Sequence, residues 1–279
     1  MPGENAPVLS VEIWPSRTNE QSERLELLLK VLKDAPIDFV SVTYGALGSD
    51  RPRTLALAER LASEGFRVVA HLACLAHTVA ELRSLIQRYI DLGVAGILAL
   101  RGDTPLEGSE ISAGDLPHAV DLVRLVKEVE PEMPVAVALH PAGHPDAPSR
   151  ELDLSYSAKK LALADFGITQ FFVEGEEYRS MIAGLAGLGV VKPVSAGIIV
   201  PASGRQLARM SEMAGVTLPK KLFAEYVAAG SDRASLRVVG ERFAFSLAEE
   251  SLAAGASGVH LFSMNSPDAA RAFIARFAG

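Results

Sequence analysis

Polar and charged residues follow directly on short apolar runs at several points along the chain. The stretch "LALRGDTP", residues 98–105, changes from apolar side chains to Arg101, Gly102 and Asp103 within one residue. Charged side chains do not extend a buried strand, so such residues mark strand ends. The residues found at these positions are Glu12, Thr43 with Tyr44, His71, Arg101 with Asp103, His140 with His144, Gln170 and Asn265. If one face of the fold gathers these strand ends, the set favours a catalytic or binding site on that face.

Each of these residues taken alone also has a structural explanation. Glu12 could cap a helix or pair with Arg17, and His71 could be a core histidine. Arg101 and Asp103 could form a surface pair, and Gln170 could fill a layer of side chains inside a barrel. The functional interpretation therefore depends on the residues meeting in space, which the sequence predicts only through the fold.

The spacing of potential ligands and nucleophiles argues against several kinds of chemistry. His71, His140 and His144 come from separate runs, without a cysteine partner or an H-x-x-x-H helix, so no metal site is expected. The chain contains no G-x-S-x-G motif and no phosphate-binding P-loop. Cys74 is the single cysteine, which excludes an intrachain disulfide.

Eight short apolar runs, rich in β-branched or aromatic residues, have the length of strands. They are "VLSVEIW" (8–14), "FVSVTY" (39–44), "VVAHLAC" (68–74), "GILAL" (96–100), "PVAVALH" (134–140), "ITQFFVE" (168–174), "VSAGIIV" (194–200) and "GVHLFSM" (258–264). Helical patterns lie between them. One begins with a capping box formed by Thr78 and Glu81 and ends at Gly93. After residue 216 the pattern predicts one long helix.

Strands that alternate with helices predict parallel pairing through crossover connections. Eight such units in 279 residues match an α/β fold, the closed (β/α)8 TIM barrel, with residues 1–279 forming a single domain. A doubly wound sheet is the alternative, but no strand is followed by G-x-G-x-x-G. Because catalytic groups of such barrels lie at the carboxyl ends of the strands, the polar strand ends are predicted to meet at one mouth.

Composition and charge limit the class of partner. A hydrophobic content of 49% supports a sizeable core. A net charge of -7 and a pI near 5.5 argue against a broad nucleic-acid-binding face. The N-terminus lacks a secretory pattern, and no apolar run reaches the roughly 18 residues of a spanning helix. A soluble, cytoplasmic protein without membrane contact is expected, and a homo-oligomer stays open.

Eight segments in order along the chain resemble the methylenetetrahydrofolate reductase family, a flavin-dependent barrel of one-carbon metabolism. They are "SVEIWPSR", "FVSVTYGA", "HLAC", "LALRGD", "HAVDLV", "GHPDA", "ADFGITQFF" and "SGRQLARM". The likeness runs from about residue 8 to residue 265, and "SVTYGA" and "ALRGD" are its most specific motifs. With no appended regulatory domain, the chain is similar to the short bacterial form of the family.

The resemblance implies an enzyme that reduces 5,10-methylenetetrahydrofolate to 5-methyltetrahydrofolate. FAD is the implied cofactor, and NADH or NADPH is the implied cosubstrate. The nicotinamide gives its hydride to the flavin and leaves, and the folate then takes its place, a ping-pong sequence that supplies methyl groups for methionine synthesis. The implied partners are these small molecules, with no nucleic acid and no membrane. Nothing in the sequence distinguishes NADH from NADPH.

The same resemblance assigns roles to residues at the predicted mouth. Glu12 matches the general acid, which protonates the leaving nitrogen when the folate ring opens. Burial beside Trp14 and the flavin would raise the pKa of this acid. Asp103 matches a carboxylate that stabilises the developing cation. The implied substrate contacts are Ser10, Glu12, Asp103, Gln170, Gln206 and Met210.

The implied FAD contacts spread over several predicted loops. They are Thr43, His71, Arg101, Gly102, Asp103, His118, Ala119, His140, His144, Asp153 and Lys160. Gly102 would let the backbone approach the flavin ring closely. Lys160 would neutralise the diphosphate, with Asp153 in the ribose region. Lys159 is the alternative cation, because the match there requires a one-residue deletion.

Several positions depart from the family's usual residues. The departures are His118 and His140 in place of tyrosines, Met210 in place of a phenylalanine, Ala73 in place of a threonine and Ser266 in place of an arginine. They leave open a divergent flavin barrel that reduces another one-carbon carrier or binds folate without turnover. A flavin- or pterin-binding module and a subunit of a methyl-transfer complex are further alternatives. The presence of Glu12, Asp103 and Gln170 together favours the enzyme.

Overall fold

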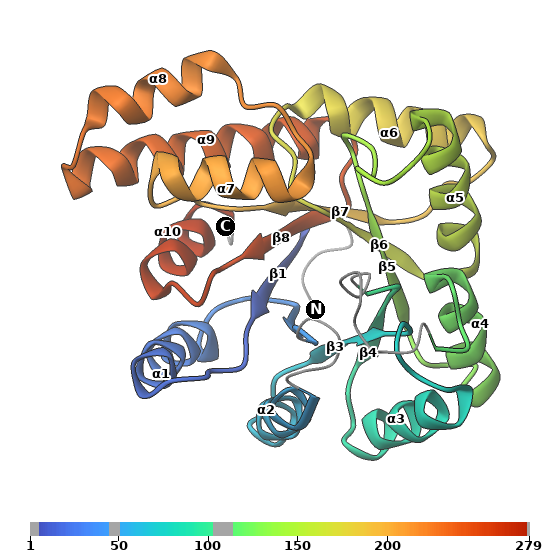
Figure 1. The fold of residues 1–279 in the computed structure, drawn as a ribbon. Helices are drawn as coiled ribbons and strands as arrows, with labels where there is room; N and C mark the ends of the chain where they lie inside the picture. The colour runs from blue at the N-terminus through green and yellow to red at the C-terminus, as the bar shows by residue number, and fades with distance from the viewer. Residues whose placement is uncertain (1–5, 45–50, 103–113, 278–279) are drawn as a thin grey trace, which may run out of the picture.

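The computed structural model describes residues 6–44, 51–102 and 114–277. In these ranges eight parallel strands pair in chain order, and β1 pairs with β8 to close the ring (Figure 1). The strands are β1 (Val8–Ile13), β2 (Phe39–Val42), β3 (Val68–Ala73), β4 (Gly96–Leu100), β5 (Val135–Leu139), β6 (Phe166–Thr169), β7 (Val194–Ile198) and β8 (Gly258–Phe262). The predicted (β/α)8 barrel is confirmed.

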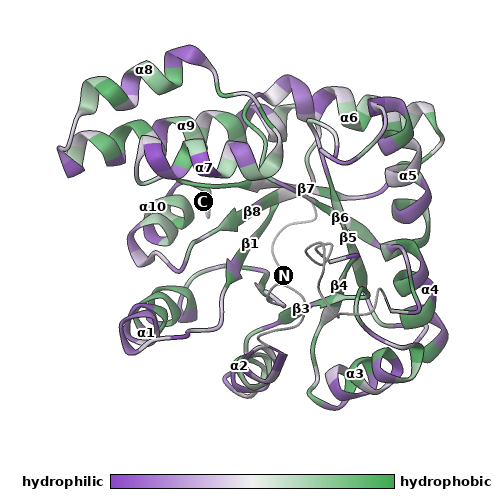
Figure 2. Cartoon of the chain, in the orientation of Figure 1, coloured by the Kyte–Doolittle hydropathy of each residue, from purple (hydrophilic) through white to green (hydrophobic). Residues whose placement is uncertain are grey.

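Helices surround the barrel (Figures 1 and 2). They are α1 (Asn19–Lys33), α2 (Arg51–Ser63), α3 (Val79–Asp91), α4 (Ala119–Val129), α5 (Arg150–Leu163), α6 (Gly175–Gly187), α7 (Gly204–Ala214), α8 (Lys220–Ala229), α9 (Arg233–Ala253) and α10 (Pro267–Phe277). Of these, α8 lies outside the surrounding layer, against α9. The predicted capping box of Thr78 and Glu81 begins α3 and is confirmed. No helix within the described ranges is long and apolar enough to cross a membrane.

The sixth strand differs from its prediction. The apolar run 168–174 was expected to form it, but β6 spans Phe166–Thr169. The chain leaves the sheet after Thr169, whose hydroxyl accepts a hydrogen bond from the Gly197 backbone at 2.8 Å. The following residues Phe171 and Val173 pack in a separate core cluster with side chains of α7, α8 and α9. Hydrophobicity marked this segment as buried, but the strand ends at Thr169, where its pairing with β5 stops.

The region after residue 216 also differs from its prediction. Instead of one long helix, α8 and α9 pack against each other across a sharp turn at Gly230. Gly230 has a φ of +61°, which a residue with a side chain rarely adopts. The Asp232 carboxylate then caps α9 through the Ser235 backbone N–H. With α7, these helices form the stack at the upper left of Figure 1.

Apolar side chains fill the barrel toward the amino ends of its strands. Val69, Leu98, Ala136 and Ile168 form one buried cluster, against which Phe39 and Phe166 pack. These two phenylalanines begin β2 and β6, and their rings meet edge to face with centroids 6.0 Å apart. The barrel is therefore a packed core at this end, as is usual for the fold. The polar residues lie toward the opposite end.

Candidate active site

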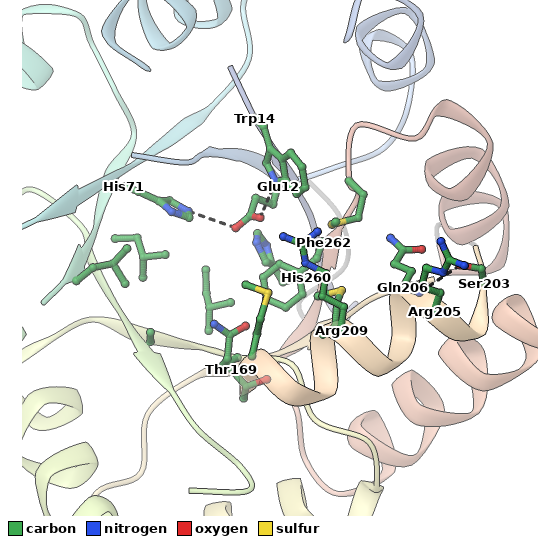
Figure 3. A pocket seen from close by; sticks show the side chains of 18 residues that line it. Glu12, Trp14, His71, Thr169, Ser203, Arg205, Gln206, Arg209, His260 and Phe262 are labelled. Carbon is green, nitrogen blue, oxygen red and sulfur yellow. Dashed lines mark hydrogen bonds and ion pairs between the residues drawn. The ribbon is translucent and has the colours of Figure 1, made fainter. Parts of the chain in front are cut away.

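A pocket of about 710 Å³ lies at the carboxyl ends of the barrel strands (Figure 3). Strand residues and their first loop positions form its floor, and α7 forms one wall. The lining residues from the strands and strand ends are Glu12, Trp14, His71, Leu98, Leu100, Ala138, Ile168, Thr169, Gln170, His260, Phe262 and Met264. Those from α7 and its N-cap are Ser203, Arg205, Gln206, Arg209, Met210 and Met213. The pocket occupies the position at which this fold carries its active sites.

Glu12 places a carboxyl group in the floor of this pocket. Its side chain is 13% exposed, and Oε2 lies 3.8 Å from His71 Nε2. Trp14 Nε1 donates a hydrogen bond to Oε1 at 3.2 Å. Burial raises the pKa of Glu12 to about 7, while the Trp14 hydrogen bond acts in the opposite direction. Burial, and not the indole contact, therefore makes this group able to donate a proton near neutral pH.

His71 is a neutral neighbour of that acid. Burial lowers the pKa of His71 to about 4, so the imidazole is uncharged where Glu12 titrates. The 3.8 Å approach of the two side chains is consequently a contact between polar groups and not an ion pair at neutral pH. Nε2 of His71 is buried and has no hydrogen-bond partner in the described part of the molecule. Such an atom is well suited to a partner supplied by a ligand.

A second histidine, His260, lies in the barrel interior and was not among the predicted site residues. Its Nδ1 is 2.7 Å from Ser10 Oγ, and its Nε2 is 3.3 Å from Ser41 Oγ. Burial and the neighbouring His71 lower the pKa of His260 to about 3, so it too is neutral. Ser10, expected to contact substrate, is fully buried and holds this imidazole instead of lining the pocket. The available sequence feature was a histidine in the middle of an apolar strand run.

Two glutamines from neighbouring units of the barrel line the pocket. Gln170 follows β6, and its Oε1 accepts a hydrogen bond from the Phe171 backbone at 2.8 Å. Gln206 lies in the first turn of α7, and its Oε1 accepts from the Ala202 backbone at 2.7 Å. Because both oxygens are engaged by the protein, the amide nitrogens are the groups left to donate to a ligand. Met210, the third predicted substrate contact in this region, lies one turn after Gln206 and also lines the pocket.

A separate polar group follows β5 and continues onto α5. The rings of His140 and His144 meet edge to face with centroids 4.6 Å apart. Burial, Lys160 and His144 lower the pKa of His140 to about 3, and its buried Nδ1 has no partner among the described residues. Burial lowers the pKa of Lys160 to about 8, opposed by Asp153. Lys159, the alternative cation, is exposed and lies over the ring of Tyr156. The geometry thus favours Lys160 as the inward-facing cation.

The other predicted cofactor contacts surround the mouth without lining its main pocket. Thr43 is half-buried after β2, while His118 is exposed at the N-cap of α4 and Ala119 begins that helix. Arg101 approaches Asp146 at 3.9 Å. Gly102 has a φ of +91°, which requires glycine at this turn. Asp103 lies outside the described residues.

Asn265 was a candidate site residue because it follows a strand. In the structure it has a structural role. Its side chain donates to the Trp14 carbonyl at 2.9 Å and accepts from the Trp14 backbone N–H at 3.0 Å. Ser263 donates to the Glu12 carbonyl. These bonds fasten the end of β1 to the loop after β8. Among the described residues, no group of three or more His, Cys, Asp or Glu side chains could hold a metal ion.

The mouth pocket of this TIM barrel holds a protonatable carboxyl, neutral histidines and two amides, a set that suits proton transfer to a small organic molecule. The family model for methylenetetrahydrofolate reductase matches residues 2–278. The 5,10-methylenetetrahydrofolate reductases of Pectobacterium carotovorum subsp. carotovorum and Escherichia coli K12 are each 30% identical to this chain over 259 residues. The match covers 92% of this chain, and 85% and 86% of those proteins respectively. The chain belongs to the methylenetetrahydrofolate reductase family.

A solved structure supports the fold assignment. An uncharacterized protein from Clostridium thermocellum that binds two copies of 5-methyl-5,6,7,8-tetrahydrofolic acid superposes with a TM-score of 0.66 at 14% identity. The alignment covers 98% of this chain and 94% of that one. At this level of identity the likeness concerns the fold.

Proposed function

We propose that this protein reduces 5,10-methylenetetrahydrofolate to 5-methyltetrahydrofolate, with FAD carrying the hydride from NADH or NADPH. The product would supply methyl groups for methionine synthesis. The observation that carries the proposal is Glu12, a carboxyl group with a pKa of about 7 in the floor of the mouth pocket. Gln170 and Gln206 present hydrogen-bond donors to the same space. Family membership identifies the folate as the substrate that fits this set.

The reaction requires a proton at one nitrogen and a hydride at one carbon. Opening the five-membered ring of the folate breaks the bond between the methylene carbon and N10, and leaves a cationic iminium at N5. Glu12 supplies the proton that N10 takes as it leaves, because burial raises its pKa to about 7 and so lets the carboxyl hold a proton near neutral pH. The hydride then adds to the iminium carbon, which becomes the methyl group. The carboxylate regains its proton from water entering through the open pocket.

The two glutamines and Met210 would hold the folate during this step. Amide nitrogens of Gln170 and Gln206 can donate to the carbonyl and ring nitrogen atoms of a pterin. Met210 offers a deformable apolar surface in the wall opposite the floor, where a thioether can pack against an aromatic ring. These contacts would orient the ring so that its leaving nitrogen faces Glu12.

Unpaired buried groups around the mouth fit an anionic cofactor with many polar atoms. The buried His71 Nε2 and His140 Nδ1 lack partners among the described residues. Lys160 is a partly buried cation whose lowered pKa reflects an environment that a phosphate would improve. We assign the flavin-ring end to His71 and the diphosphate end to Lys160 and His140. When bound, FAD would accept a hydride from the nicotinamide and pass it to the folate. Asp103, outside the described residues, stays a predicted contact near the flavin and pterin.

Separate assays of the two half-reactions test this proposal. The first is oxidation of NADH or NADPH with menadione as acceptor. The second is transfer of the hydride to methylenetetrahydrofolate. Both are followed by flavin absorbance. E12Q is expected to retain the first reaction, since no leaving nitrogen needs a proton there. It should lose the second by on the order of 10²- to 10⁴-fold. E20Q, which alters an exposed glutamate of α1, should leave both reactions unchanged.

Three outcomes contradict parts of the proposal in different ways. A purified protein that binds no FAD in a titration would refute the cofactor assignment. Equal loss of both half-reactions in E12Q would make Glu12 a structural residue. Wild-type protein that oxidises nicotinamide but does not reduce the folate would support a divergent flavin barrel instead.

A further inference from the structure

The wall of the mouth pocket carries two positive charges that the proposed chemistry does not use. Arg205 and Arg209 lie one turn apart on α7, and both line the pocket together with Gln206 (Figure 3). Residues four apart on a helix lie on the same face, about 6 Å apart. Both side chains are exposed. The two guanidinium groups therefore stand at the rim, above the floor that holds Glu12.

These arginines have no anionic partner within the described ranges. Ion pairs with Asp or Glu fix many other arginines of the chain, including Arg60, Arg83, Arg242 and Arg276. Among the described residues, no such contact is present for Arg205 or Arg209. The rim is thus positive in a protein whose net charge is -7. A local charge of opposite sign to the whole molecule, placed at a pocket, attracts an anionic ligand.

The rest of the lining is mostly uncharged, so the positive charge of the pocket is concentrated at the arginines of α7. His71 and His260 are neutral, and Glu12 is partly protonated near neutral pH. Apolar side chains, including Phe262 and Met210, line the same pocket. A ligand that matches this pattern has a polar ring at one end, an aromatic middle and an anionic far end.

We propose that Arg205 and Arg209 bind the carboxylates of the glutamyl tail of a folate whose pterin ring lies at Glu12. This inference rests on the proposed function and adds the residues that recognise the tail. Arginine pairs with carboxylates through two parallel hydrogen bonds, and the two side chains offer one such site for each of two carboxylates. A tail with more glutamyl units carries more carboxylates and gains more from this rim. The α7 N-terminus at Ser203, also in the lining, adds a favourable dipole.

Binding without turnover measures this contribution directly. The probes are 5-methyltetrahydrofolate with one and with three glutamyl units, and the tetrahydropteroate analogue that lacks glutamate, each titrated by calorimetry. Wild-type protein is expected to bind the triglutamate most tightly and the pteroate least tightly. The double variant R205A/R209A should bind the glutamyl forms on the order of 10- to 100-fold more weakly and bind the pteroate unchanged. Added salt should weaken glutamate-dependent binding in the wild type only.

Two controls separate tail recognition from other causes. R233A removes an exposed arginine of α9 that does not line the pocket, and it should bind all three probes like the wild type. KM for NADH and for NADPH in the menadione assay is also measured for R205A/R209A, because the proposed sequence places the nicotinamide in the same pocket before the folate. If the double variant loses affinity for NADPH and keeps the wild-type dependence on glutamate number, the rim binds nicotinamide phosphates and the inference is wrong.

Failure of the inference and failure of the proposed function give different results. If the wild type binds the folates but R205A/R209A retains the same preference for glutamate number, the arginines are solvated surface charges. If the wild type binds none of the three probes, the proposed folate function fails, and the tail site fails with it. Retained menadione activity in that case would still indicate a nicotinamide-oxidising barrel.

Discussion

Replacing Glu12 by glutamine is expected to change how the stability of the protein depends on pH. Burial raises the pKa of Glu12 from 4.5 to about 7 in the folded state. In the unfolded chain the same carboxyl ionises near its ordinary value. Between these two pH values the folded state holds a proton that the unfolded state has lost. The stability linked to this group is therefore fully present below pH 4.5 and is lost as the pH rises through about 7.

The size of the effect follows from the two pKa values. A difference of one unit between the pKa values of the folded and unfolded states changes the free energy of unfolding by about 1.4 kcal/mol. The rise from 4.5 to about 7 therefore corresponds to about 3 kcal/mol. Glutamine has nearly the same shape and cannot ionise. The free energy of unfolding of E12Q minus that of the wild type should thus increase by about 3 kcal/mol from pH 4.5 to 8. A constant offset from the altered hydrogen bond with Trp14 does not affect this slope.

Urea unfolding followed by far-ultraviolet circular dichroism, at several values between about pH 5 and 8, measures the two stability profiles. E20Q is the matched control, since Glu20 is an exposed residue of α1, and its profile should run parallel to that of the wild type. Parallel profiles for E12Q and the wild type would refute the reasoning. They would mean that Glu12 ionises in the folded protein as it does in water, and the acid role would lose its physical basis.

Three further substitutions test other parts of the structure. K160A should weaken FAD binding by about 1–3 kcal/mol in a fluorescence titration. K159A, which alters the exposed neighbouring lysine, should change FAD binding little, and equal effects of the two variants would contradict the assignment. S10A should lower the free energy of unfolding by about 1–3 kcal/mol, because it leaves Nδ1 of the buried His260 without its 2.7 Å partner; an unchanged urea midpoint would contradict this. G102A should lower it by about 1–3 kcal/mol, since alanine is strained at a φ of +91°; unchanged thermal unfolding would show that the loop relaxes.

Local patterns were sufficient to predict the barrel. Apolar runs of strand length alternating with helical patterns leave few arrangements for a chain of this size, and the register of β1 with β8 completes the expected ring. Element ends were less predictable where tertiary pairing decides them. Phe171 and Phe172 continue an apolar run, yet they pack outside the sheet because pairing with β7 stops at Ile168 and pairing with β5 stops at Thr169. Gly230 breaks a helical pattern whose periodicity alone does not show a turn.

The site was predictable to the extent that strand ends define it. Glu12, His71 and Gln170 were identified by that rule and meet in one pocket. The rule could not identify Arg205 and Arg209, because they lie on a helix in the connection after β7, and their position over the mouth is a tertiary property. Polar residues deeper in the strands were a further difficulty, since Ser10 holds a histidine where the resemblance implied a substrate contact.

The hydrogen bonds around Asn265 connect these structural residues to the chemistry. Asn265 binds both the N–H and the carbonyl of Trp14, and Ser263 binds the carbonyl of Glu12, so the first and last strands are joined just beyond the ring closure. A carboxyl that must be buried to keep its proton cannot lie on a mobile loop, since water would reach it and restore its ordinary pKa. The two left-handed residues at Met264 and Asn265 form the tight turn that makes these bonds. The loop after β8 thereby holds Glu12 at the depth at which burial raises its pKa.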